Sequence, residues 1–132
     1  STGALIVIAH KNDLTEFKET GLAVDAIISD QLIESIFYKN NPMHDGAVII
    51  SENKIAAARC ILPVSSNMDL PPELGLRHRA AIGITEKNDS VAIIVSEQTG
   101  RISYCRNGEL SLDIKASGLK TMLTEDFSVK RH

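Results

Sequence analysis

The stretch HDGAVIISENKIAAARCILPV, residues 44–64, decides the fold because it holds two apolar runs separated by a turn. Residues 48–50 and 55–64 are rich in β-branched and small apolar side chains, which favours buried strands. The polar residues 51–54 between them predict a hairpin. We therefore expect two neighbouring strands here, with a polar segment directly in front of the first.

Further strand-like runs lie on both sides of this hairpin, at residues 4–9, 22–28, 91–95 and 102–106. Asn107-Gly108 predicts a tight turn after the last of them. Helix candidates alternate with these runs: residues 30–38 behind the N-cap Ser29, residues 74–82 between a Pro-Pro pair and a glycine, and residues 114–123. The pattern predicts one α/β (α+β) domain over residues 1–127, with a mixed central β-sheet flanked by helices, and a frayed C-terminal tail over residues 128–132.

Composition excludes several classes of protein. The chain has 132 residues, 43% of them hydrophobic, and a net charge of -3, so no overall basic field draws it to nucleic acid. Cys60 and Cys105 lie far apart in apolar runs, which disfavours a zinc site or a disulfide framework and predicts buried thiols in a reducing cytosol. No apolar run approaches the roughly 20 residues of a membrane span.

Three polar segments carry candidate chemistry. In residues 41–47, Asp45 stands at the mouth of a strand and Gly46 lets a ligand approach the backbone, although Asp-Gly is also an ordinary turn. Arg77-His78-Arg79 suits a polyphosphate because guanidinium groups match phosphate oxygens, although such a cluster is also typical of a solvated surface.

The third segment, Ser96-Glu97-Gln98-Thr99-Gly100, ends the run 91–95. Its hydroxyls and backbone amides suit phosphate and Glu97 suits a divalent ion, although many strand-to-turn transitions look the same. Together the three segments favour nucleotidyl transfer. The chain lacks both GxxxxGK[ST] and GxGxxG, which disfavours a P-loop NTPase and a dinucleotide-binding fold.

The ordered set of His44-Asp45-Gly46-Ala47, residues 74–81 around Arg77-His78-Arg79, and residues 95–100 resembles the diadenylate cyclase (DAC) domain family. The resemblance runs from Gly3 to about Leu123 and is nearest to the membrane-anchored type. It implies that two ATP molecules are condensed into cyclic di-AMP, with release of two pyrophosphates, between two facing protomers of a homodimer. It also implies a cytoplasmic location at the bacterial membrane, through a segment preceding this chain, and leaves room for a regulatory protein partner.

The resemblance implies roles for individual residues. Asp45 assists attack by the ribose 3′-hydroxyl, and Arg77, His78 and Arg79 act on the triphosphate. The expected ATP contacts further include Gly46, Ala47, Leu62, Pro63, Leu76, Ser96 and Thr99. The expected ligands of a divalent metal (Mn²⁺, Mg²⁺ or Co²⁺) are His44, Asp45 and Glu97.

One position departs from the family pattern. The resemblance indicates that many members have threonine where this chain has Leu76. If that threonine hydroxyl contacts phosphate, this chain lacks the contact and is expected to differ in affinity or metal preference. Two other functions stay open at this point. A sensor that binds ATP or cyclic di-AMP without turnover has no need of Asp45, and a metal-dependent phosphohydrolase requires more clustered carboxylates than the sequence offers.

Overall fold

A computed structural model describes residues 3–38, 41–67 and 69–128. Within these residues the strands form a single seven-stranded sheet in the order β2-β4-β3-β1-β5-β6-β7. The strands are β1 (Ala4–Ile8), β2 (Leu22–Ile27), β3 (Ala47–Ser51), β4 (Lys54–Cys60), β5 (Val91–Val95), β6 (Ile102–Arg106) and β7 (Glu109–Ile114). β1 and β3 pair in parallel and the other neighbours are antiparallel. The predicted mixed sheet is confirmed.

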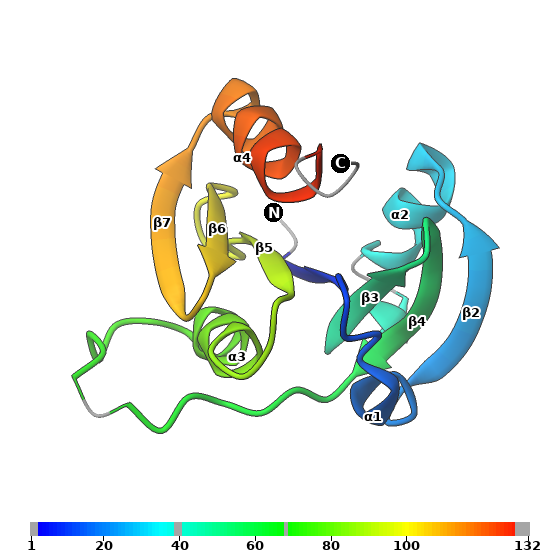
Figure 1. Cartoon of the computed structure of the whole chain (residues 1–132), viewed down its shortest axis with the longest axis horizontal. Helices are drawn as coiled ribbons and strands as arrows, with labels where there is room; N and C mark the ends of the chain where they lie inside the picture. The colour runs from blue at the N-terminus through cyan, green and yellow to red at the C-terminus, as the bar shows by residue number, and fades with distance from the viewer. Residues whose placement is uncertain (1–2, 39–40, 68, 129–132) are drawn as a thin grey trace.

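Helices cover both faces of the sheet. They are α1 (Thr15–Lys18), α2 (Asp30–Ile36), the short 3-10 helix η1 (Pro42–His44), α3 (Leu76–Thr85) and α4 (Ala116–Ser128). Figure 1 shows α1 and α3 on one face and α2 and α4 on the other. Because side chains alternate along a strand, Leu5 of β1 packs in the cluster that contains Ile84 of α3, whereas Ile6 packs against the cluster that contains Ile36 of α2.

Local signals in the sequence explain several element boundaries. The Ser29 hydroxyl accepts a hydrogen bond from the Leu32 N–H at 3.1 Å, so it is the N-cap predicted for α2. Asn107 and Gly108 have φ angles of 51° and 77°, as a tight hairpin turn between β6 and β7 requires. The hairpin predicted at residues 51–54 joins β3 to β4 and is also confirmed.

Several strand and helix boundaries predicted from the sequence were wrong. β4 ends at Cys60, so residues 61–64 are not strand, and Ile61 and Val64 are 70% and 51% exposed. α3 spans Leu76–Thr85 rather than residues 74–82, because Gly83 lies inside the helix instead of ending it. The third helix begins at Ala116, not at residue 114, and continues through Ser128. Residues 129–132 of the predicted tail lie outside the described residues.

Both cysteines are buried and unpaired, as predicted. Burial raises the pKa of the Cys60 thiol to about 11, so this thiol is protonated near neutral pH and is not a nucleophile. Among the described residues, no helix combines the length and the apolar character needed to cross a bilayer.

Candidate functional site

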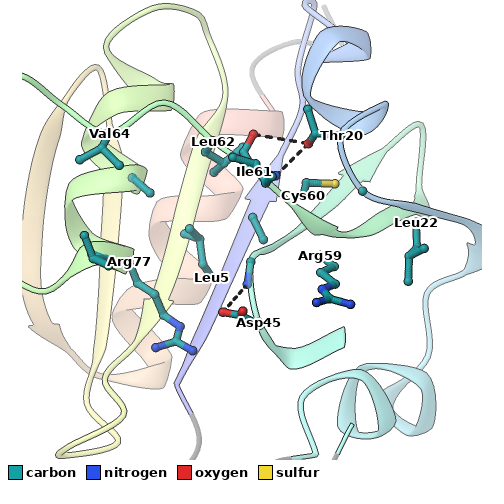
Figure 2. Close-up of a pocket in the computed structure, with 15 residues that line it drawn as sticks. Leu5, Thr20, Leu22, Asp45, Arg59, Cys60, Ile61, Leu62, Val64 and Arg77 are labelled. Carbon is teal, nitrogen blue, oxygen red and sulfur yellow. Dashed lines mark hydrogen bonds between the residues drawn. The ribbon is translucent and has the colours of Figure 1, made fainter. Parts of the chain in front are cut away.

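A cavity of about 680 Å³ opens between β1, the start of β3, the end of β4 and α3. Figure 2 shows Asp45, Arg59 and Arg77 around it, together with apolar side chains such as Leu5 and Leu62. These residues come from segments that are far apart in the sequence. Mostly apolar walls with a few converging charged groups are typical of a small-molecule site.

The Asp-Gly pair is placed by the turn in front of β3. The Asn41 side chain accepts a hydrogen bond from the Met43 N–H at 3.0 Å and so caps η1, which delivers Asp45 to the mouth of the strand. Gly46 has φ of 79°, and a Cβ there would lie 2.9 Å from backbone atoms of Arg59 and Cys60. Only glycine therefore allows β3 and β4 to approach this closely beside Asp45.

An apolar wall faces these polar groups. It includes Leu22, Ile61 and Val64, each at least half exposed. Thr20 fixes this wall: its hydroxyl accepts a hydrogen bond from the Ile61 N–H at 2.8 Å and lies 2.6 Å from the Phe17 carbonyl oxygen, to which it donates. Four residues of this cavity were not predicted from the sequence: Thr20, Leu22, Arg59 and Ile61. The one signal available was the apolar run that continues beyond Cys60.

A second cavity of about 370 Å³ adjoins the first and shares Leu76 and Arg77 with it. Ser96 and Glu97 line it from the end of β5, and His78 from α3. The Ser96 hydroxyl accepts hydrogen bonds from the N–H groups of residues 98 and 99, both at 3.3 Å, so these bonds leave its proton available for an anion.

Arg77 stands where the two cavities meet. Its Nη1 lies 3.4 Å from the Glu97 Oε2, and its Nε is buried without a hydrogen-bond partner. A buried donor that is unsatisfied costs about 1–3 kcal/mol, which favours an acceptor arriving at this point. Burial, followed by the charge of Arg77, lowers the pKa of His78, so this imidazole is neutral at pH 7.

Arg79 points elsewhere. Its Nε donates to the Leu74 carbonyl at 3.1 Å and its Nη2 to the Pro71 carbonyl at 2.8 Å. It lines neither cavity, because residues two positions apart on a helix point in different directions. The side chain ties the segment before α3 to the helix.

Some of the other predicted site residues line a cavity and some do not. Gly46, Ala47 and Leu62 line the larger cavity, and Leu76 lines both. Besides Arg79, three predicted residues line neither cavity: Pro63, His44 and Thr99. The Pro63 carbonyl packs against Gly83, the His44 Nδ1 lies 2.7 Å from the Asn41 carbonyl oxygen, and the Thr99 hydroxyl accepts from the Arg101 N–H.

The predicted metal ligands do not form a cluster. Across residues 3–38, 41–67 and 69–128, no three His, Cys, Asp or Glu side chains are close enough to hold an ion. Asp45 lines the larger cavity and Glu97 the smaller. A protein that binds Mg²⁺ with a nucleotide usually supplies one or two carboxylates, and phosphate and water oxygens complete the coordination. The carboxylates of Asp45 and Glu97 fit that kind of site, and an all-protein cage is not required.

Comparisons with known proteins agree with a nucleotide site. The family model described as "DisA bacterial checkpoint controller nucleotide-binding" matches residues 1–110. The cyclic di-AMP synthase CdaA of Bacillus subtilis is 46% identical over 125 residues, which are 95% of this chain and 46% of that protein. The diadenylate cyclase of Listeria monocytogenes is 48% identical over 124 residues, 94% of this chain and 45% of that protein.

A solved structure shows the same fold. A double mutant of DacA from Staphylococcus aureus superposes with a TM-score of 0.92 at 44% identity, covering 96% of this chain and 84% of that one. The chain spans about half the length of the curated relatives described above.

Proposed function

This chain belongs to the diadenylate cyclase family of nucleotide-binding domains, and from that premise we propose that it condenses two ATP molecules into cyclic di-AMP. The observation that carries the proposal is the cavity that brings Asp45, Gly46 and Arg77 together and continues into a second cavity with Ser96. Nucleotidyl transfer requires a carboxylate near the attacking hydroxyl, backbone that a nucleotide can approach closely, and several groups that bind successive phosphates.

The two cavities suit the two ends of a nucleotide. The exposed apolar wall of Leu22 and Ile61 offers an apolar surface to a purine ring, and a cavity of about 680 Å³ is large enough for base and ribose. The triphosphate then extends past Arg77 toward Ser96 in the smaller cavity. Guanidinium and hydroxyl groups there neutralise and orient phosphate oxygens.

Each reaction step replaces one bond at phosphorus. The 3′-oxygen of one ATP forms a bond to the α-phosphorus of the other, the bond to the β-phosphate oxygen breaks, and pyrophosphate leaves with the electron pair. The proton of the 3′-hydroxyl must be removed. Asp45 is an exposed carboxylate whose Oδ1 accepts the N–H of Gly46 at 3.1 Å and no other hydrogen bond from the residues that the structure describes. It is therefore available to orient that hydroxyl and take its proton.

A divalent metal (Mn²⁺, Mg²⁺ or Co²⁺) belongs to the proposal. Asp45 and Glu97 would supply its carboxylate ligands, and phosphate and water oxygens would complete the coordination. Bound there, such an ion would stabilise the negative charge that develops on oxygen. His44, whose Nδ1 faces the Asn41 carbonyl, remains a weaker candidate ligand.

The proposed reaction requires two protomers if each cavity binds one nucleotide, because each new bond joins two nucleotides. We propose that the active state is a homodimer with the cavities facing each other. Attachment to the cytoplasmic face of the membrane through a preceding segment, and control by a regulatory protein, are further proposals. The greater length of the relatives is consistent with such additional segments.

Incubation of the purified chain with ATP and each metal in turn, followed by chromatography, tests the proposal. We expect cyclic di-AMP from the wild type and none from Asp45→Asn, which keeps the side-chain shape but loses the charge. Asp25→Asn is the matched control, because Asp25 is an exposed carboxylate outside both cavities. ADP or AMP as the product would identify a hydrolase, and saturable binding with unchanged ATP would identify a sensor.

A further inference from the structure

We propose that Arg59 binds the phosphate group that becomes bonded to the 3′-oxygen beside Asp45. The inference rests on the proposed function and deepens it, since it concerns the second nucleotide rather than the one held in the same cavity. Arg59 lines the larger cavity, and its backbone lies against Gly46, next to Asp45.

A β-bulge aims Arg59 into the cavity. In the β3–β4 ladder Ala47 pairs with Cys60 and Ile49 with Ala57, so β4 carries one more residue than β3 between these pairs. Arg59 lies in this bulge and has φ of 58°, in the left-handed region that residues other than glycine rarely adopt. Bulges re-aim side chains and are frequent beside active sites. Without the bulge, strict alternation along β4 would direct this side chain differently.

The charges of the site leave a role for another cation. Arg77 lies 3.4 Å from Glu97, and Arg79 is committed to two backbone carbonyls. Arg59, by contrast, makes no side-chain hydrogen bond or ion pair with any residue in the part of the chain that the structure describes. An exposed guanidinium on a cavity wall is therefore available to a ligand.

The position of Arg59 indicates that it contacts the phosphate attacked by the 3′-oxygen and not the triphosphate of the resident nucleotide. Figure 2 shows Arg77 and Arg59 on opposite sides of Asp45. The triphosphate of the resident nucleotide extends toward Arg77 and the smaller cavity, so the phosphate attacked by the 3′-oxygen must approach Asp45 from outside that path. That phosphate is an anion entering beside a carboxylate, which is repulsive unless a cation lies close by. Arg59 is the guanidinium on that side of Asp45.

Simple nucleotides separate the two phosphate positions. Adenosine 3′-monophosphate carries its phosphate on the 3′-oxygen, adenosine 5′-monophosphate carries it toward Arg77, and adenosine carries none. Dissociation constants for all three are measured by NMR titration of the wild type and of Arg59→Asn. Asparagine removes the charge and tolerates the left-handed backbone, so the variant is expected to fold. We expect Arg59→Asn to raise the dissociation constant of adenosine 3′-monophosphate alone, by roughly fivefold to tenfold, since the contact is partly exposed.

Three variants sharpen the result. Arg59→Lys keeps the charge and should retain most of the affinity for the 3′-monophosphate. Lys54→Gln removes a positive charge from the same strand outside both cavities, and should change none of the three constants. Arg77→Ala should show the opposite preference, losing affinity for the 5′-monophosphate.

Three results for Arg59→Asn would each overturn the assignment of Arg59: an equal loss of affinity for all three ligands, a loss of affinity confined to the 5′-monophosphate, or no loss of affinity. These binding measurements need no turnover. A wild type that binds nucleotides but forms no cyclic di-AMP would therefore refute the proposed activity while the comparison between the two monophosphates still decides the role of Arg59.

Discussion

Gly83→Ala should destabilise the protein although alanine is the better helix former. In an exposed helix interior the exchange gains about 1 kcal/mol. Gly83 is buried in α3, however, and a Cβ there would overlap the Pro63 carbonyl oxygen and lie 2.9 Å from the Ser65 backbone nitrogen, where ordinary contact begins at 3.4 Å. Both neighbours are backbone atoms and cannot change rotamer. The overpacking cost should therefore reach the upper end of its usual range of about 1–3 kcal/mol, for a net loss of about 2 kcal/mol.

Urea unfolding followed by far-ultraviolet circular dichroism measures this, since the chain contains no tryptophan for fluorescence. We expect a lower midpoint at an unchanged slope. Gly118→Ala is the control, because a Cβ at that position in α4 meets nothing within 4 Å, and it should stabilise by up to about 1 kcal/mol. If Gly83→Ala also stabilises, close packing between α3 and residues 63–65 is not the reason for this glycine. Because Leu62 lines the cavity just before the displaced segment, KM for ATP should rise as well.

Three further predictions concern α3. Arg79→Ala should lower the free energy of unfolding by about 1–2 kcal/mol in urea titrations, as two hydrogen bonds to carbonyls are lost, whereas Arg77→Ala should reduce turnover with little effect on unfolding. Leu76→Thr should leave the fold intact and lower KM for ATP several-fold, because Leu76 is 76% exposed where the cavities meet; an unchanged KM would show that the position does not face phosphate. The pKa of His78 is lowered in the folded protein from the ordinary histidine value of 6.5. The stability linked to its neutral form is therefore fully present above pH 6.5 and is lost as the pH falls through the lowered pKa. His78→Gln should therefore flatten the decline in unfolding free energy between pH 7 and pH 5, and an unchanged decline would contradict the assignment.

The sequence predicted those parts of the fold that local chemistry determines. The Ser29 cap and the Asn107-Gly108 turn each depend on a few adjacent residues, and both are confirmed. Residues 91–95 were predicted as a strand and form β5 with the same bounds. In each case the local preference and the tertiary structure agree, which is the usual condition for a correct prediction from one sequence.

Errors arose where a residue serves a distant neighbour. Residues 61–64 have the composition of a strand, but Ile61 and Val64 are exposed on a cavity wall, where apolar surface suits a ligand rather than a core. Gly83 was expected to end α3 because glycine is a weak helix former, yet it lies inside the helix so that residues 63–65 can approach. Arg59 and Thr20 could not be found at all. Their positions depend on a strand bulge and on a hydrogen bond that spans 41 residues.

The motif Arg77-His78-Arg79 shows why a motif is not the same as a set of ligands. Successive residues of a helix point about 100° apart, so one face cannot present all three side chains. Arg77 lines both cavities, His78 lines the smaller, and Arg79 binds the carbonyls of residues 71 and 74. Because these bonds fix the segment that starts α3, Arg79 sets where Arg77 stands. Replacing both arginines together would combine a loss of phosphate binding with a loss of that support, whereas single replacements separate the two. On this geometry, Arg59 rather than Arg79 is the residue that we propose as the second cation for the reacting phosphates.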